Sequence, residues 1–413
     1  MDLNDHFFRH ESPRLVAALT RIFGVHNLPL AEDVVQDAFG RALEVWKVRG
    51  IPENPSAWLM ATAKNRALDV VRRERTARVF APEVSRYFES EWTTGPVVDE
   101  AFREQTVLQE QLRMMFSCCH PRLPEEVQVA LILNILCGFG TNEIASAFLV
   151  GRAAIEKRIQ RGKKVLAASQ RLFDLTDSDF EERLTGVRRA LYLVFSEGYH
   201  SASGEAAVRA ELCGEAMRLT GLLREYPAAD TPATNALAAL MYLHAARLPA
   251  RVDSAGDLHS LMQQDRSSWD ARLLAEGLAL FERSAAGTEL TGYHLEAAIA
   301  AAHASARSVE ETDWAAIVSL YDRLMDVAPS PVVALNRAIA VAERDGAERG
   351  LEALRTIADH ERLASYPFYP AALGELELRA GHRDSARTHF AAALGLARNS
   401  AERRFLEERL AQL

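Results

Sequence analysis

The chain has few of the features that mark membrane, secreted or zinc-binding proteins. Its 413 residues contain no apolar run of about eighteen residues, the length that spans a membrane. The N-terminal stretch MDLNDHFFRHESPRL carries acidic residues and no apolar run of signal-peptide length, which favours a cytoplasmic protein. The four cysteines show none of the CxxC spacings of tetrahedral zinc sites. We therefore expect no metal, no cofactor and no disulfide framework.

Two adjacent cysteines lie in the stretch MMFSCCHPRLPEE, residues 114–126. Apolar residues at helical spacing place Cys119 on the buried face of one helix, which Pro121 ends. The next helix begins at LPEE, with proline near its first position and acids in its first turn. Small buried cysteines are common in cores, so packing is the first interpretation. A redox-sensitive thiol at Cys118 and a metal ligand remain alternatives.

Alternating apolar and polar residues, the pattern of a β-strand, are also missing. Apolar residues instead recur at steps of three and four, with abundant Ala, Leu, Glu and Arg. This pattern predicts an all-α protein with two small helical modules and a helical extension. The expected ranges are a first module at 1–78, a linker at 79–100, a second module at 101–172, a middle domain at 178–305 and a repeat domain at 306–413.

An excess of positive charge is absent overall, since 57 acidic residues outnumber 48 basic ones and the net charge is -9, but two segments are strongly basic. Residues 64–78 hold six basic residues against Asp69 and Glu74, and residues 152–171 hold seven against Glu156 alone. Such patches are typical of nucleic-acid-binding surfaces. Each patch, taken alone, is also compatible with an ordinary solvated helix face.

The second patch belongs to a predicted helix-turn-helix in GFGTNEIASAFLVGRAAIEKRIQRGKKVL, residues 138–166. Thr141 is suited to cap a short helix, a turn follows at residues 149–151, and a second helix starts at Arg152. Ile155, Ile159 and Leu166 would face the core. The opposite face offers Arg and Gln, which read base edges, and Lys, which neutralises phosphates.

The first patch follows an acidic helix. In AEDVVQDAFGRALEVW, residues 31–46, the apolar side leaves acids and Gln36 exposed, a face unsuited to DNA. In SAWLMATAKNRALDVVRRER, Ser56 would cap a helix that buries Leu59, Ala63, Ala67 and Val70. Its amide and basic side chains, beside the Pro- and Gly-containing loop 48–54, could hold a single strand with flipped bases.

The order of these motifs resembles an extracytoplasmic-function (group IV) sigma factor of bacterial RNA polymerase over roughly residues 6–170. AEDVVQDAF looks like the region-two helix that docks on the polymerase clamp, and WLMATAKNRALDVVRRER is similar to the helix that melts and reads the minus-10 element. EIASAFLVGRAAIEKRIQRGKKVL looks like the region-four helix-turn-helix that reads the minus-35 element. Gly151, Arg152 and Glu156 depart from the residues common in the family, which leaves the promoter sequence open.

The resemblance implies partners and contacts, namely core RNA polymerase and promoter DNA. Polymerase contacts would come from Asp33, Gln36, Asp37 and Arg41. Minus-10 contacts would come from Trp58, Lys64, Asn65, Arg66, Arg72 and Arg73. Minus-35 contacts would come from Arg152, Lys157, Arg158, Gln160, Arg161 and Lys164. Core packing is the alternative role of Trp58.

The last hundred residues show a repeat. In YPAALGELELRAGHRDSARTHFAAALGLA, Leu373, Gly374, Ala386, Phe390 and Ala393 occupy the offsets of a tetratricopeptide (TPR) repeat. This layout resembles a subgroup of these sigma factors with a large C-terminal extension containing TPR-like repeats. It implies that the extension modulates activity, with a protein or small-molecule signal as a further partner.

Two other interpretations stay open. One is a polymerase-independent helix-turn-helix DNA-binding regulator whose repeats recruit a protein partner. The other is an enzyme with its site in residues 190–300, where Glu197, Tyr199, His200, Asp265, Arg266 and Asp270 concentrate polar groups. Because no nucleophile motif, phosphate loop or metal-ligand spacing accompanies these groups, we expect helix packing and no catalysis.

Overall fold

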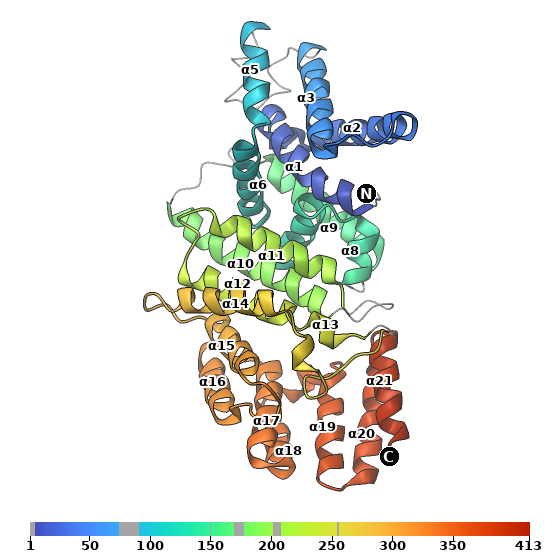
Figure 1. The fold of residues 1–413 in the computed structure, drawn as a ribbon, viewed down its shortest axis with the longest axis vertical. Helices are drawn as coiled ribbons and strands as arrows, with labels where there is room; N and C mark the ends of the chain where they lie inside the picture. Colours follow the sequence, from blue (N-terminus) through green and yellow to red (C-terminus); the bar gives the residue numbers. More distant parts are fainter. Residues whose placement is uncertain (1–4, 74–90, 149, 169–176, 201–207, 254–255) are drawn as a thin grey trace. The chain divides into compact units, whose positions relative to one another are not determined.

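The computed structural model of the chain describes residues 5–73, 91–148, 150–168, 177–200, 208–253 and 256–413 (Figure 1). Within these ranges the regular elements are helices, and the only β-pairing is an isolated bridge between Val252 and Leu258. The expected all-α fold is therefore confirmed. The chain divides into two compact units, Met1–Ser146 with Val150–Leu193, and Ala147–Leu149 with Val194–Leu413. We call them the N-terminal and C-terminal units.

The N-terminal unit is built around the long helix α1, which packs against α2, α5 and α6. Its apolar side, including Leu15, Leu19 and Phe23, is fully buried. The helices of this unit are α1 (Asp5–Phe23), η1 (Val25–Asn27), α2 (Leu28–Arg49), α3 (Pro55–Arg73), α5 (Glu91–Ala101), α6 (Glu104–Cys118), α7 (Glu125–Leu131), the π-helical η3 (Ile132–Leu136), α8 (Thr141–Ala147), α9 (Arg152–Ala168) and most of α10 (Asp177–Tyr199).

Helix α5 occupies the end of the range 79–100, which we predicted to be a linker, and continues to Ala101. Residues 74–90 of that range are outside the described residues. Val98 and Ala101, one turn apart, are buried where α5 packs against α3 and α1. Among residues 95–101, the part of α5 whose burial is described, these two are the buried ones, so the period is weak there and tertiary packing decides this helix.

N-capping side chains begin several helices of the C-terminal unit. Thr231, Asp270, Asp313, Ser330 and Asn399 each accept a backbone N–H in the first turn of the helix that follows. Besides the end of α10, the helices of this unit are α11 (Ala210–Arg224), α12 (Pro232–Ala245), α13 (Leu248–Arg251), η4 (Arg266–Ser268), α14 (Ala271–Ser284), α15 (Gly292–Ser305), α16 (Trp314–Val327), α17 (Pro331–Asp345), α18 (Ala347–Arg355), η5 (His360–Leu363), α19 (Phe368–Arg379), α20 (Arg383–Leu396) and α21 (Ser400–Ala411).

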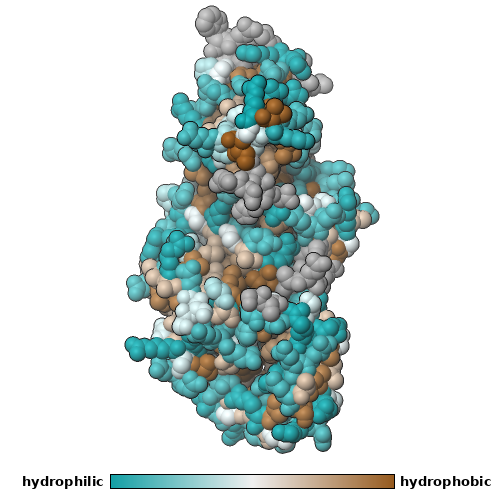
Figure 2. All heavy atoms as spheres, turned by 45° about the vertical axis from the view of Figure 1, so that its right-hand side comes forward, coloured by the Kyte–Doolittle hydropathy of each residue, from teal (hydrophilic) through white to brown (hydrophobic). Residues whose placement is uncertain are grey.

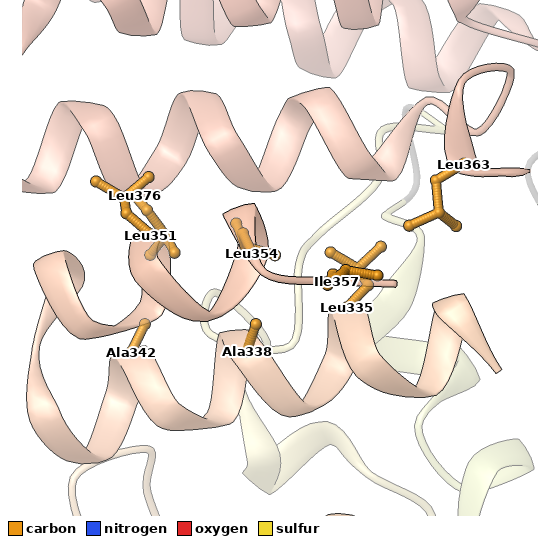
Figure 3. Close-up of a cluster of buried hydrophobic side chains, with 8 residues drawn as sticks. All are labelled: Leu335, Ala338, Ala342, Leu351, Leu354, Ile357, Leu363 and Leu376. Atoms are coloured by element: carbon orange, nitrogen blue, oxygen red, sulfur yellow. The ribbon is translucent and has the colours of Figure 1, made fainter. Parts of the chain in front are cut away.

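Consecutive helices pack as pairs in the second half of this unit, most closely α17 with α18 and α19 with α20. Figure 3 shows the core that α17, α18 and α19 share, where Leu351 meets Leu376 at one end and Leu335 meets Ile357 at the other. A Cβ on Gly350 would lie 2.4 Å from Cβ of Ala342, so a glycine is needed there. In the next pair Gly374 faces the Phe390 ring, as the repeat pattern requires. The TPR-like assignment and the boundary at residue 305 stay predictions.

Candidate nucleic-acid interface

Helix α2 presents the predicted polymerase-docking residues to solvent. Val34, Val35, Ala38, Ala42 and Trp46 form its buried side, as the apolar spacing predicted. The opposite side exposes Asp33, Gln36, Asp37 and Arg41. We call these four residues the docking face.

Just past the docking face the surface is apolar. Leu43 is 61% exposed and Val48, in the last turn of α2, is 84% exposed. Ile51 follows in the loop and is 45% exposed. On the face drawn in Figure 2 most residues are hydrophilic and the hydrophobic ones form small separate groups, so exposed apolar surface is limited to small areas of that face.

The predicted minus-10 residues on α3 differ in their exposure and in their ion pairing. Asn65, Arg72 and Arg73 are exposed. Lys64 and Arg66 are half-buried and paired: Lys64 Nζ lies 2.7 Å from Asp99 Oδ1 of α5, and Arg66 Nε donates to Asp37 Oδ2 at 2.8 Å. One predicted DNA-binding residue is thus bonded to the docking face, and another to the acidic helix α5.

Two predictions for this region were wrong, and the alternative role of a third residue is favoured. Val71 is buried where we expected Val70, since residues 59, 63, 67 and 71 follow one face of the helix. Ser56 is no cap, because Asn54 Oδ1 accepts from the Ala57 N–H at 3.0 Å and Ser56 Oγ donates to Glu11 at 2.9 Å. Trp58 is half-buried with its ring 5.2 Å from that of Trp46, which favours its core alternative.

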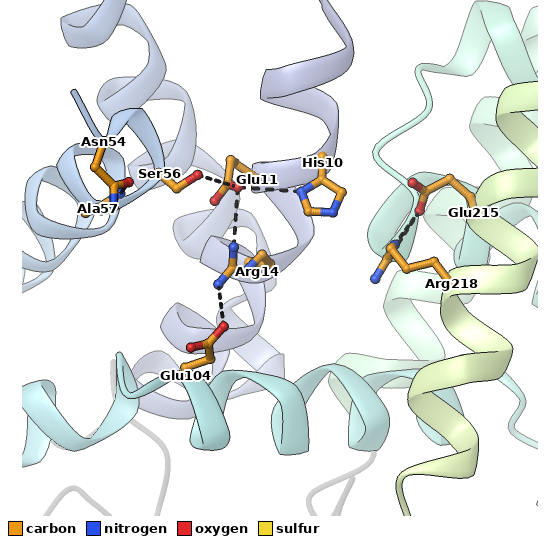
Figure 4. A network of polar contacts seen from close by, with 9 residues as sticks. All are labelled: His10, Glu11, Arg14, Asn54, Ser56, Ala57, Glu104, Glu215 and Arg218. Carbon is orange, nitrogen blue, oxygen red and sulfur yellow. Dashed lines mark hydrogen bonds and ion pairs between the residues drawn. The ribbon is translucent and has the colours of Figure 1, made fainter. Parts of the chain in front are cut away.

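Glu11 is the centre of a polar network that holds α3 against α1 (Figure 4). Its carboxylate receives Ser56 Oγ and lies 3.4 Å from Arg14, which in turn lies 3.6 Å from Glu104 of α6. Burial raises the pKa of Glu11, but hydrogen bonds from His10 and Ser56 and the charge of Arg14 together bring it below its ordinary value. The ionised carboxylate therefore stabilises the position of α3.

The predicted helix-turn-helix is present as α8 and α9. Ile155, Ile159 and Leu166 are buried as expected, and Gly162 lets α9 approach Leu131 of α7. Gly140, not Thr141, precedes the first helical residue, and its N–H donates to Glu143 Oε2 at 2.8 Å. The site residues on α9 are exposed except for half-buried Arg158: Arg152, Lys157, Gln160, Arg161 and Lys164.

A hollow of about 370 Å³ follows this cationic face. Lys157, Gln160, Arg161 and Lys164 line it together with Arg122. Arg122 was not predicted as a site residue, because it lies in the α6–α7 loop, 35 positions before Lys157. It directly precedes the acidic stretch LPEE and belongs to no helical period, so the sequence gave no signal for it. The cationic surface therefore extends from α9 to Arg122 in the α6–α7 loop.

The two modules are in direct contact within the N-terminal unit. Arg9 of α1 pairs with Glu143 of α8 at 2.5 Å, and Lys163 of α9 pairs with Glu32 of α2, also at 2.5 Å. Arg21 adds a bond to Glu110 of α6 at 2.7 Å. We call Arg9–Glu143 and Lys163–Glu32 the inter-module ion pairs.

The cysteines are packed in the interior. All four are free and at most 2% exposed. Burial raises the pKa of the Cys118 thiol to about 12, against the opposing charge of Lys163, so the reactive thiolate is disfavoured. Among the described residues no group of three or more His, Cys, Asp or Glu side chains could hold a metal ion. Packing is the interpretation that this geometry supports.

Two of the polar residues noted in 190–300 cap the N-termini of helices, and a third bonds backbone carbonyls. Asp265 accepts the Ser267 N–H and Asp270 accepts those of Arg272 and Leu273. Arg266 donates to the carbonyls of His303 and Ala306 at 2.9 Å. None of the described helices is long and apolar enough to cross a membrane.

Comparisons with known proteins assign the same modules. The sequence model of sigma-70 region 2 matches residues 7–77, and that of sigma-70 region 4 matches residues 113–166. Residues 183–285 match a family of unknown function, DUF6596. An uncharacterized protein of Rhizobium meliloti (strain 1021) is 39% identical over 405 residues, covering 97% of this chain and 93% of its own length. The chain belongs to the family of that protein, and its regions 2 and 4 make it a promoter-recognising sigma factor of group IV.

Proposed function

We propose that the chain binds core RNA polymerase through the docking face, holds the minus-10 strand with α3 and reads the minus-35 duplex with α9. The observation that carries this proposal is the pairing of opposite surfaces in one unit, an exposed acidic face on α2 and an exposed cationic face on α9. Arginine and glutamine on α9 have the geometry for base edges, and lysine supplies phosphate contacts. No covalent chemistry is required of the chain.

The contact between the modules supports a further part of the proposal, that the sigma activity is held back and then released. The minus-10 and minus-35 elements are about 25 base pairs apart, or about 85 Å along the duplex at about 3.4 Å per step. Lys163 and Glu32 are 2.5 Å apart, so the inter-module ion pairs must break before both elements are read together. We infer that the C-terminal extension, joined to the N-terminal unit through α10, sets when they break.

Polymerase binding is tested by co-elution of the purified chain with core RNA polymerase in gel filtration. Replacing Asp33 and Gln36 together by Ala should weaken binding without unfolding the protein, because both side chains are exposed. Asp69→Ala, which removes an exposed acid from α3, is the matched control. If the wild-type chain does not bind polymerase but binds duplex DNA tightly, the polymerase-independent regulator replaces this proposal.

The role of the extension needs a fragment that keeps the N-terminal unit whole. Leu184, Val187, Ala190 and Leu191 of α10 are buried, so a cut near residue 175 would remove part of the core. A fragment that ends at Leu193 retains them. Faster promoter opening by this fragment than by the whole chain would support an inhibitory extension, and equal rates would contradict control by the extension.

A further inference from the structure

The C-terminal unit holds two arginines without an acidic partner among the described residues, of which Arg247 is buried and Arg251 half-buried. Arg247 and Arg251 stand one helical turn apart at α13, and Arg247 is only 8% exposed. Arg247 Nε donates to Gln264 Oε1 at 3.3 Å, and Arg251 Nη2 donates to Nδ1 of His200 at 3.1 Å. In the described part of the chain no carboxylate is bonded to either guanidinium. A buried charge without a counter-ion is strongly unfavourable.

The neighbouring arginines differ from these two. Arg266 donates to two backbone carbonyls and to Thr312 Oγ1, each at 2.9 Å. Arg398 pairs with the buried Glu402 at 2.7 Å. Arg266 thus has three neutral acceptors, although its buried Nε has no partner, and Arg398 has a carboxylate, whereas Arg247 and Arg251 have one side-chain acceptor each.

Unpartnered polar atoms gather around the same two arginines. The Arg247 guanidinium lies 5.4 Å from the Trp269 ring centre, and that of Arg251 lies 4.4 Å from the Tyr199 ring centre. The His244 ring is 5.0 Å from that of Tyr199. Buried atoms without a hydrogen-bond partner here are Tyr199 Oη, His244 Nδ1, Arg251 Nε, Trp269 Nε1 and His303 Nδ1.

Most of these orphan atoms are donors. Arginine and indole N–H groups only donate, and the tyrosine hydroxyl can do so. Burial lowers the pKa of His303 to about 3, helped by the charges of Arg247 and Arg266, so this ring is neutral and adds no charge of its own. Because buried polar groups in native proteins nearly always have partners, a cluster of orphan donors around two cations indicates a missing acceptor.

A hollow of about 150 Å³ adjoins Arg251. Its apolar walls include Phe368 of α19 and Phe405 and Leu406 of α21. The one carboxylate in its lining, Glu402, is already bonded to Arg398. A space of this size beside a guanidinium suits a small molecule with an apolar part.

We propose that Arg251, with Arg247 one helical turn before it, binds the oxyanion group of a small molecule, a phosphate or a carboxylate, whose apolar part occupies the hollow that Arg251 lines together with residues of α19 and α21. Arginine forms two parallel N–H···O bonds with either group, and the anion supplies the missing charge. This site does not depend on the proposed promoter function. Within that function it would be the place where a metabolite reaches the extension.

The experiment measures thermal unfolding of the whole chain at pH 7 and constant ionic strength, in sodium chloride, sodium phosphate or sodium succinate. We expect phosphate or succinate to raise the unfolding midpoint with saturation at millimolar concentration, while chloride does not. The arm that responds distinguishes a phosphate from a carboxylate ligand. If neither anion acts beyond chloride, the proposal is overturned.

Three variants separate binding from a merely structural role. Arg251→Gln should raise the half-saturating anion concentration at least tenfold, whereas Arg283→Gln, which removes a half-exposed partner of Asp230, should leave it unchanged. Arg247→Met should also lose the anion response, yet raise the midpoint without anion because it removes an uncompensated buried charge. An unchanged anion response in Arg251→Gln, or a lowered midpoint with an intact response in Arg247→Met, would refute the site.

Discussion

Reversing one charge of an inter-module ion pair should open the N-terminal unit. Lys163 Nζ and Glu32 Oε1 are 2.5 Å apart, and the two side chains are 23% and 34% exposed. Pairs this accessible contribute up to about 1 kcal/mol, and Lys163→Glu replaces the attraction by a repulsion of similar size. The contact between the modules should therefore weaken by about 1–2 kcal/mol, a factor of about 5–30 in the ratio of open to closed forms.

Fluorescence energy transfer between α2 and α9 measures this opening directly. Glu44→Cys and Ala154→Cys place labels on exposed positions of the two helices. The native cysteines are buried, so the introduced thiols should label selectively. We expect a larger low-transfer population in the Lys163→Glu background and faster promoter binding by the same chain.

The reciprocal variant controls for effects of the single change. Glu32→Lys combined with Lys163→Glu restores the attraction and should restore the wild-type transfer distribution. Arg349→Glu, which breaks an exposed ion pair with Glu352 in the C-terminal unit, should have no effect. The reasoning is refuted if Lys163→Glu leaves the distribution unchanged, or if the reciprocal variant stays open.

Further predictions concern packing, pH and DNA binding. Gly350→Ala should cost about 1–3 kcal/mol through overpacking, while Gly395→Ala, in a helix with open space, should stabilise by about 0.5–1 kcal/mol; equal unfolding midpoints would contradict this. His303 has its folded pKa lowered to about 3 from an ordinary 6.5, so the stability from its neutral form is complete above pH 6.5 and is lost as pH falls toward 3. Between pH 6.5 and 5 the wild type should lose about 2 kcal/mol more than His303→Gln in denaturant unfolding, and parallel curves would exclude the effect. Arg161→Ala and Arg122→Ala should each reduce the slope of log K against log salt for minus-35 DNA by about 0.9, and an unchanged slope would remove that residue from the interface.

Sequence periodicity predicted the elements that are long and one-sided. The α9 face came out correctly because Ile155 and Ile159 repeat at helical spacing and bury one side of a sufficiently long helix. Helix α5 was missed because the described part of it, residues 95–101, buries only Val98 and Ala101, which is too few residues to show a period. The prediction that Ser56 caps α3 was wrong because Asn54, two residues earlier, can also accept a backbone N–H. The position of Glu11, which receives Ser56 Oγ, decides which of the two residues caps the helix.

The candidate sites were predictable only where one helix carries them. The exposed residues of α2 and α9 follow from local spacing, so their positions on the surface could be stated in advance. The pairing of Arg66 with Asp37 and the burial of Arg247 depend on contacts between helices distant in sequence. A single sequence gives no signal for such contacts, which is why the arginine site in the extension was missed.

The bond between Lys64 and Asp99 gives the proposed minus-10 surface an internal competitor. A carboxylate carried on the same chain acts at an effective concentration on the order of millimolar, and DNA must displace it. Non-specific DNA binds weakly, with dissociation constants of roughly 10⁻⁴ to 10⁻⁶ M. The free-energy cost of displacing Asp99 therefore lowers the fraction of protein bound to non-specific DNA more than the fraction bound to a promoter. An acidic helix beside the DNA-binding lysine would thus increase the preference for promoter DNA over non-specific DNA without contacting a base.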